Sequence, residues 1–168
     1  MIKHPFPPLY NNKSAILILG SFPSVKSREQ LFFYGHPQNR FWKVIATVLE
    51  SDEPNTIEEK KKLLLENGIA LWDVIASCEI TGSSDSSIKN VIVNDISQIL
   101  EAADIKQIFV NGKTAEKYFK KYTKPLINRD AICLPSTSPA NAAWSADRLV
   151  EKWKVIKSVQ FKQGERLY

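Results

Sequence analysis

The chain is poor in the residues that build metal centres, disulfide frameworks and membrane spans. Its 168 residues include two cysteines, Cys78 and Cys133, and two histidines, His4 and His36. No combination of these has the spacing of a zinc site, so no metal is expected. Because disulfides belong mainly to oxidising compartments, the two cysteines are expected to be free and buried in a reducing one. No apolar run is long enough to span a bilayer, so no membrane association is expected.

Other absences narrow the class of protein further. The first residues, MIKHPFPPLYNNK, lack the apolar centre of a signal peptide. A cytoplasmic protein is therefore expected, associated with the nucleoid if the source is a prokaryote. The phosphate-binding pattern GxxxxGK[ST] is absent. The GxSxG pattern of serine hydrolases is absent too, and His36 would be the only base available to a hydroxyl nucleophile, which disfavours that class.

The composition is typical of one globular domain. Apolar residues make up 43% of the chain and charged residues 24%, which predicts a single folded domain over 1–168. Residues 1–13, rich in proline and asparagine, are predicted to form an irregular N-terminal arm. The net charge of +5, with an isoelectric point near 9.1, is compatible with a polyanionic partner.

Strand-like and helix-like patterns alternate along the chain. Continuous apolar runs predict buried strands, and apolar residues three and four apart predict amphipathic helices. Thr56 and Glu59 form a capping box at the start of one helix, which is expected to end at Gly68. Strands are predicted at 15–19, within the apolar run 69–75, at 108–110 and at 131–134; helices are predicted at 41–49 over about three turns, at 57–66, after Asp95, at 115–122 and after Ser145. The alternation predicts a mainly parallel sheet with helices on both faces.

Ligands of such sheets bind beyond the carboxyl ends of the strands. Three polar segments are predicted to lie there: GSFPS at 20–24, NGK at 111–113 and PSTSP at 135–139. The aromatic segment FFYGHPQNRFW, at 32–42, comes shortly after the first of them. The backbone N–H groups of a strand-end turn such as GSFPS can bind an anion or a carbonyl group.

The aromatic segment at 32–42 has two interpretations from its residues alone. In one, Phe41 and Trp42 belong to the core face of the following helix, and Asn39 caps that helix. In the other, its rings, amide and imidazole form a stacking platform for a flat heterocycle beside the ligand cleft. The segment LPSTSPANAAWS, at 134–145, is likewise either a loop leading to a helix cap or a source of hydroxyl and N–H contacts to phosphate.

Taken in order, these segments resemble the uracil-DNA glycosylase superfamily, and within it the hypoxanthine-DNA (deoxyinosine) glycosylase branch. GSFPS stands where the first motif of the superfamily stands, and LPSTSPANA occupies the second. HPQNRFWKV is similar to a stretch of the mismatch-specific bacterial uracil glycosylases, and VNGK to the strand-end turn of related enzymes. ALWDVIASCEITGSSDSSI resembles the middle of the hypoxanthine branch. The resemblance extends from Ile16 to Trp153.

The resemblance implies a three-layer α/β/α sandwich around a short, mainly parallel central sheet, in agreement with the alternation. It also implies an enzyme that flips a deaminated base out of double-stranded DNA and hydrolyses its N-glycosidic bond, leaving an abasic site. Hypoxanthine is the expected base. No cofactor is expected, and the chain is expected to act as a monomer.

The resemblance also implies roles for individual residues. Many members hold the attacking water with Asp or Asn at the position of Phe22, whose ring has no polar atom, so Asn39 is implied to position that water instead. Tyr34 aligns with the aromatic residue on which the flipped base stacks, and Phe22 is expected to cover another side of the pocket. The backbone N–H groups of Ser21 and Phe22 are candidate donors to the departing base, and His36 is a further candidate.

The expected phosphate ligands are Ser136, Ser138, Asn141 and Lys113. Three alternatives stay open at this point, with a plain nucleotide-binding α/β domain as the fallback, although no Gly-rich phosphate motif supports it. The first is a mismatch-specific uracil or thymine glycosylase on the same scaffold. The second is a lyase in which Lys113 forms a Schiff base. The third is a nucleic-acid-binding module of the same fold without catalytic activity, which the apolar Phe22 side chain keeps open.

Overall fold

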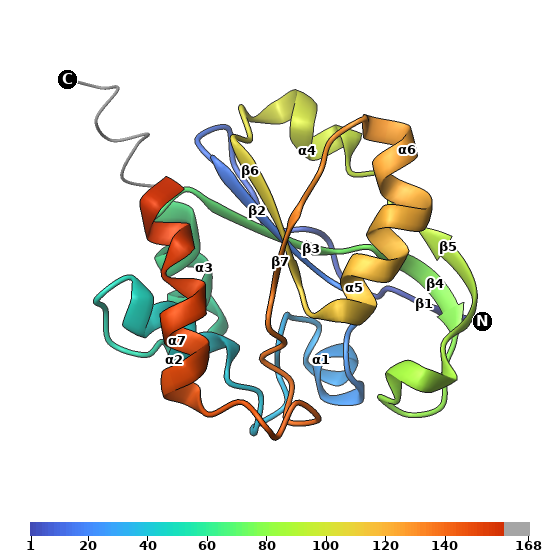
Figure 1. The fold of residues 1–168 in the computed structure, drawn as a ribbon, viewed down its shortest axis with the longest axis horizontal. Coiled ribbons are helices and arrows are strands. Elements are labelled where there is room, and N and C mark those ends of the chain that lie inside the picture. The colour runs from blue at the N-terminus through green and yellow to red at the C-terminus, as the bar shows by residue number, and fades with distance from the viewer. Residues whose placement is uncertain (160–168) are drawn as a thin grey trace.

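The computed structural model describes residues 1–159, and a four-stranded parallel sheet lies at its centre (Figure 1). The strands are β2 (Ile16–Gly20), β3 (Ile69–Asp73), β6 (Gln107–Asn111) and β7 (Ile132–Leu134). Their order is β3-β2-β6-β7, and each neighbouring pair is parallel. β2 and β3 are buried along their whole lengths, as expected for strands that are covered on both faces.

Helices cover both faces of this sheet. On one side lie α2 (Phe41–Val48), α3 (Ile57–Glu66) and α7 (Ala146–Trp153), and on the other lie α5 (Lys113–Tyr118) and α6 (Lys124–Ile127) (Figure 1). The remaining helices are α1 (Val25–Gln30), which follows β2, and α4 (Ser97–Ala102), which precedes β6. The arrangement is the predicted three-layer α/β/α sandwich.

A second, smaller sheet is absent from the sequence prediction. It contains β1 (Ile2–Lys3), β4 (Ile75–Glu79) and β5 (Lys89–Val93) in the antiparallel order β1-β4-β5. The short strand expected within 69–75 is β3, and the end of that apolar run belongs to the small sheet, because the chain leaves the parallel sheet after Asp73 and enters the small sheet at Ile75. A continuous apolar run does not reveal such a change of sheet.

The prediction of an irregular arm at 1–13 is wrong for part of that segment. Ile2 and Lys3 pair with β4. Leu9 and Leu71 exchange two backbone hydrogen bonds of 2.9 Å, which tie the arm to β3. A two-residue strand and a single bridge are too short to produce a periodicity that a sequence pattern can reveal.

Most of the helix predictions hold, with differences at their ends. Thr56 accepts the Glu59 N–H and caps α3, and Ser145 accepts the Arg148 N–H and caps α7. α2 has eight residues, which is about two turns and not three. The helix predicted at 115–122 is interrupted after α5 by a π-helical segment, η2 (Phe119–Thr123). In the described part of the chain, no helix is long and apolar enough to cross a membrane.

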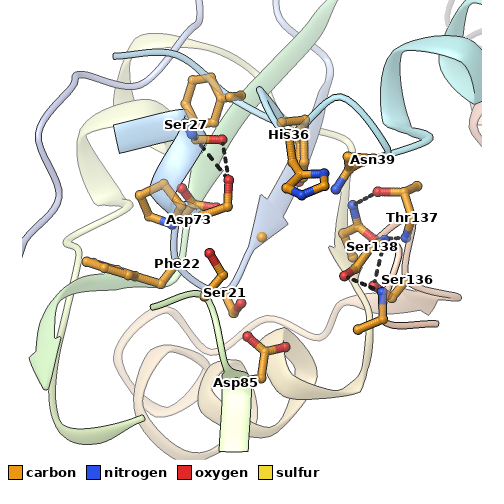
Figure 2. Close-up of a pocket in the computed structure, with 18 of the residues that line it drawn as sticks. Ser21, Phe22, Ser27, His36, Asn39, Asp73, Asp85, Ser136, Thr137 and Ser138 are labelled. Atoms are coloured by element: carbon orange, nitrogen blue, oxygen red, sulfur yellow. Dashed lines mark hydrogen bonds between the residues drawn. The ribbon is translucent and has the colours of Figure 1, made fainter. Parts of the chain in front are cut away.

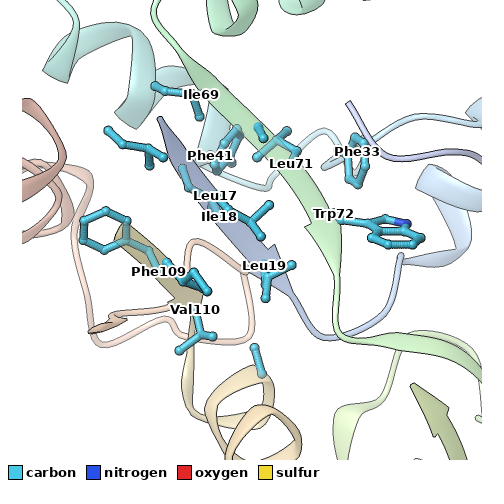
Figure 3. Close-up of a cluster of buried hydrophobic side chains, with 14 of the residues drawn as sticks. Leu17, Ile18, Leu19, Phe33, Phe41, Ile69, Leu71, Trp72, Phe109 and Val110 are labelled. Atoms are coloured by element: carbon cyan, nitrogen blue, oxygen red, sulfur yellow. The ribbon is translucent and has the colours of Figure 1, made fainter. Parts of the chain in front are cut away.

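The core lies between the sheet and its two helical layers (Figure 3). It includes four of the rings from the aromatic segment, Phe32, Phe33, Phe41 and Trp42, each less than 9% exposed. The Trp42 indole N–H donates to the Phe33 carbonyl oxygen at 3.1 Å. The core interpretation of the aromatic segment is therefore correct for these four rings. Both cysteines are free, but Cys133 is only partly buried.

Candidate active site

A pocket opens at the carboxyl edge of the parallel sheet. Gly20 ends β2, Asp73 ends β3 and Asn111 ends β6, and all three residues line the pocket together with 136–140 from the loop after β7. This is the edge at which a ligand was expected. The cavity volume is about 270 Å³. Since pockets for drug-sized ligands span about 300–1,000 Å³, this cavity suits one flat base better than a large cofactor.

Most of the predicted site residues line this one pocket, although they come from three separate segments of the chain. They are Ser21, Phe22, Tyr34, His36, Asn39, Ser136 and Ser138 (Figure 2). Lys113 and Asn141 do not line it. Lys113 is exposed at the start of α5. The Asn141 amide group donates to the Ser136 carbonyl oxygen at 3.0 Å, so one of its N–H groups supports the loop.

Asn39 takes part both in the start of α2 and in the pocket wall. Its side-chain oxygen accepts the Phe41 N–H at 2.9 Å, which is close to the capping role expected from the sequence. The N–H groups of the amide have no hydrogen-bond partner within residues 1–159. The oxygen also keeps a second lone pair. Asn39 can therefore hold a polar ligand while its side-chain orientation is fixed by the backbone.

His36 lies beside Asn39 in the pocket (Figure 2). Its Nδ1 accepts the Gln38 N–H at 3.1 Å. A nitrogen that accepts a hydrogen bond carries no proton, so the neutral ring is protonated on Nε2. His36 thereby presents an N–H donor from the side of the ring that faces away from its own backbone.

Tyr34 places its ring between the core and the pocket. One face stacks on Phe41, with ring centroids 4.1 Å apart and an interplanar angle of 21°. The hydroxyl is buried and approaches the Asn111 side chain without making a bond of normal geometry. Burial, and the nearby Asp73 carboxylate, raise the pKa of Tyr34 far above its ordinary value. The phenol therefore stays neutral, and only the face turned away from Phe41 can stack on a ligand.

The GSFPS turn is anchored through its carbonyl groups. The Val74 N–H donates to the Gly20 oxygen at 2.8 Å, and the Ile75 N–H donates to the Ser21 oxygen at 3.0 Å. The N–H groups of Ser21 and Phe22 make no hydrogen bond within the described residues 1–159. These two groups are therefore available as donors on a fixed backbone, as an anion-stabilising site requires.

The loop after β7 is held by polar bonds that the sequence did not reveal. Asn111 and Thr137 bond each other reciprocally, with the Asn111 amide donating to the Thr137 hydroxyl at 3.0 Å and the Thr137 N–H donating back at 3.1 Å. Ser136 and Ser138 each accept a backbone N–H at 3.1 Å through their hydroxyl oxygens. Their hydroxyl protons are still free to be donated to a ligand.

Arg40 clamps the same loop. Its guanidinium group donates to the carbonyl oxygens of Ser138 (2.9 Å), Asn141 (3.1 Å) and Trp144, and its backbone N–H donates to Thr137 at 3.0 Å. Nothing in the sequence indicates this role, because an arginine at a helix start is usually solvated and its partners lie about 100 residues away. Arg40 thus fixes the loop against the segment that carries Asn39.

Replacing Arg40 with alanine is expected to lower the free energy of unfolding by about 2–3 kcal/mol, because three partly buried carbonyl groups lose a charged donor. Any activity of the pocket should fall with it, since the loop loses its position relative to Asn39. Arg40→Lys should not restore either property, because one ammonium group cannot reach several divergent carbonyls. Lys43→Ala, an exposed cation on the same helix, is the matched control. Denaturant unfolding checks the prediction, and an Arg40→Ala midpoint equal to that of the control would contradict it.

Two carboxyl groups in the pocket were also missed from the sequence (Figure 2). Asp73 is 4% exposed, and its Oδ2 lies 2.7 Å from His4 Nε2. Asp85 belongs to the short helix η1 (Asp85–Ser87), where desolvation raises the pKa of its carboxyl group and the Thr114 hydroxyl partly offsets the increase. A carboxylate at the end of a buried apolar strand was the available signal for Asp73, since such a charge needs a partner.

Comparisons with known proteins agree on one family. Residues 7–160 match the sequence model of the Uracil DNA glycosylase superfamily. A Hypoxanthine DNA glycosylase of Methanosarcina acetivorans is 35% identical over 161 residues, which cover 93% of this chain and 98% of the relative. A Hypoxanthine DNA glycosylase of Methanosarcina barkeri is 33% identical over 120 residues, covering 70% of this chain and 76% of the relative.

A solved structure has the same fold. It is the solution NMR structure of a Methanosarcina acetivorans protein assigned provisionally to the uracil DNA glycosylases. The TM-score is 0.80 and the sequence identity 33%, and the match covers 95% of this chain and 99% of the other. The layered fold around the parallel sheet is therefore one that a similar sequence also adopts.

Proposed function

The chain belongs to the uracil DNA glycosylase superfamily, and on this premise we propose that it removes hypoxanthine from double-stranded DNA by hydrolysing the N-glycosidic bond. Two relatives named Hypoxanthine DNA glycosylase support the choice of base. One observation carries the assignment: a single pocket combines unengaged N–H donors from Ser21, Phe22 and His36 with the open amide of Asn39. The enzyme acts as a monomer and works where the DNA is, in the cytoplasm or nucleoid.

The target base first has to leave the duplex. Flipping costs a few kcal/mol and costs least when the base is mispaired, as hypoxanthine is opposite thymine. Stacking on an aromatic ring returns about 1–3 kcal/mol per base. The open face of Tyr34 supplies that ring, and Phe22 covers another side of the pocket.

Hypoxanthine is recognised through the groups that distinguish it from adenine. Deamination replaces an amino group by a carbonyl oxygen and turns the neighbouring ring nitrogen from an acceptor into an N–H donor. Asp73, which lines the pocket, accepts that N–H, while the donors of Ser21, Phe22 and His36 face the carbonyl oxygen. Adenine would set an acceptor against the Asp73 carboxylate, and the resulting unpaired buried groups would exclude it.

Cleavage passes through a sugar with oxocarbenium character, and negative charge develops on the departing base. Donors that are already fixed around the carbonyl oxygen stabilise this state more than the ground state. Asn39 holds the attacking water, and an amide suffices because a water that attacks a cationic carbon needs little deprotonation. The hydroxyls of Ser136 and Ser138 bind phosphates beside the flipped nucleotide, with Asn141 and Lys113 further along the strand.

Uracil is the second candidate base. It also carries a ring N–H between two carbonyl groups, so the Asp73 carboxylate would accept it as well. Tyr34 would stack on either base. What separates the two is the fit of a one-ring or a two-ring base in a cavity of about 270 Å³.

A panel of duplexes that each contain one hypoxanthine, uracil, thymine mispair or undamaged adenine tests the assignment. Hypoxanthine should be excised at least about tenfold faster than any other base, since unpaired polar groups in the pocket penalise the others. Strand breakage after alkali treatment detects the abasic product. Faster excision of uracil would move the assignment to the second candidate, and no product from any duplex would refute glycosylase activity altogether.

A further inference from the structure

His4 and Asp73 form a buried pair at the wall of the pocket. His4 follows β1 on the N-terminal arm, Asp73 ends β3, and 69 residues separate them along the chain. Their side chains are 4% and 5% exposed, and His4 Nε2 lies 2.7 Å from Asp73 Oδ2. A carboxylate buried to this degree is strongly destabilising without a donor, so His4 is what allows an acidic group at this place.

The pair leaves the other carboxylate oxygen directed to the β2 side of the pocket. A Cβ atom placed on Gly20 would lie 2.3 Å from Asp73 Oδ1. Oδ1 therefore lies directly against the backbone of the residue that ends β2, where the absence of a side chain makes room for it. No hydrogen bond within residues 1–159 uses this oxygen. It is the part of Asp73 that can accept a bond from a ligand.

The imidazole of His4 is fixed from several sides. Its ring packs edge-on against Phe6, with centroids 4.5 Å apart, and lies 6.2 Å from the ring of Phe22 at 88°. Its backbone N–H donates to the Ala76 oxygen at 2.8 Å, which anchors the arm to β4. A donor held this firmly limits the rotation of the carboxylate that it contacts.

The tautomer of His4 follows from its surroundings. Nδ1 is buried and has no hydrogen-bond partner in the described part of the chain. A proton on Nδ1 would be a buried donor without an acceptor, which the tautomer protonated on Nε2 avoids. His4 thus donates from Nε2, and Asp73 Oδ2 is the acceptor of this bond.

We propose that His4 is a positioning residue for base recognition. The N-terminal arm then takes part in recognition, because it carries the residue that orients Asp73. This inference rests on the proposed function of the site. By holding Oδ2, His4 directs Oδ1 as an acceptor toward the ring N–H of a lactam base such as hypoxanthine. Adenine and other bases that present a ring lone pair at this point are rejected. The arm therefore contributes to base selection without touching the base.

His4→Phe and His4→Gln test the proposal as a matched pair. Phenylalanine keeps a ring of similar shape against Phe6 and Phe22 but has no N–H, whereas the glutamine amide can donate from nearly the position of Nε2. His4→Phe should slow single-turnover excision of hypoxanthine by about 10- to 100-fold, because the carboxylate loses a charge-assisted bond. Affinity for DNA that contains hypoxanthine should fall by a similar factor, and affinity for an abasic-site analogue should stay within about twofold. His4→Gln should recover most of both losses.

Lys3→Ala, a change to the exposed neighbour of His4, controls for general disturbance of the arm, and it should behave as the wild type does. A merely structural role would predict that His4→Phe and His4→Gln lose stability and activity alike and that the two DNA affinities fall together. That result, or a His4→Phe rate within about twofold of the wild type, would overturn the proposal.

Asp73→Asn gives a second route if His4→Phe folds poorly. It keeps the size of the side chain and the contact with His4 but replaces the carboxyl group with an amide. The preference for hypoxanthine over an abasic-site analogue in binding should fall by about tenfold or more, and an unchanged preference would overturn the proposal. A wild type that excises no lactam base would refute the proposed function and this inference together, whereas an active wild type with unaltered variants would refute the inference alone.

Discussion

Replacing Asn39 with alanine is expected to lower the single-turnover rate of hypoxanthine excision by about 100- to 1,000-fold, the range for loss of one preorganised catalytic group. The Phe22 side chain has no polar atom and cannot take over this role. Asn39 presents unengaged N–H groups and a free lone pair to the pocket. Binding of hypoxanthine DNA should change by less than about threefold, because the amide acts on the water and not on the base.

The same amide also supports the start of α2, and a matched pair of variants separates the two roles. Asn39→Ala should lose about 1 kcal/mol of stability, because the Phe41 N–H loses its acceptor. Asn39→Asp keeps an oxygen at the cap and should unfold at the wild-type denaturant concentration. It should also excise hypoxanthine at least about tenfold faster than Asn39→Ala, since a carboxylate can orient water too.

Unfolding midpoints and single-turnover rates of the two variants check these expectations together. If Asn39 were only a cap, Asn39→Ala would lose stability and keep its rate. A fully active and less stable alanine variant would therefore remove Asn39 from the mechanism and leave the water without an assigned ligand.

Gly20→Ala is expected to reduce excision of hypoxanthine by about 100-fold, although it adds a single methyl group. The new Cβ atom would lie 2.3 Å from Asp73 Oδ1 and 3.1 Å from the Tyr34 hydroxyl. At 2.3 Å the carboxylate has to rotate, and it would then leave both His4 and the base. The stability cost of the added methyl group should be about 1–3 kcal/mol, typical of overpacking in a buried site.

A double-mutant cycle shows whether the displaced carboxylate is the cause. In an Asp73→Ala background the methyl group no longer meets Oδ1, so Gly20→Ala should change the remaining rate by less than about threefold. The four proteins can be compared by single-turnover excision at a saturating enzyme concentration. Strictly additive losses would instead attribute the effect to β2 or to Tyr34, and Asp73 would lose its role in reading the base.

Features with local causes were read correctly from the sequence. The apolar run at 15–19 predicted β2 to within one residue at each end. The pair Thr56 and Glu59 predicted both ends of α3 correctly. In a capping box, the side chain of each of the two residues accepts a hydrogen bond from the backbone N–H of the other. The order of strands and helices then placed the GSFPS turn, Asn111 and the loop after β7 at one edge of the sheet, since the carboxyl ends of parallel strands meet there.

Features that depend on contacts between distant residues could not be predicted from the sequence. Nothing in a proline-rich arm indicates that His4 would contact Asp73, and nothing at a helix start indicates that Arg40 would bind carbonyl groups in the loop after β7. The same limit applies to β1 and to the division of the 69–75 run between two sheets. Such pairings have no sequence period, because each is created only when separate elements pack together.

The sequence by itself determined the layered α/β scaffold, the edge of the sheet that holds the pocket and most of the side chains that line it. The tertiary structure alone decided which aromatic rings belong to the core, which face of Tyr34 is covered by Phe41, and where the buried Asp73 side chain lies. The physical reason is that strand and helix patterns reflect the burial of individual residues, whereas a recognition site depends on the distances between groups from separate parts of the chain.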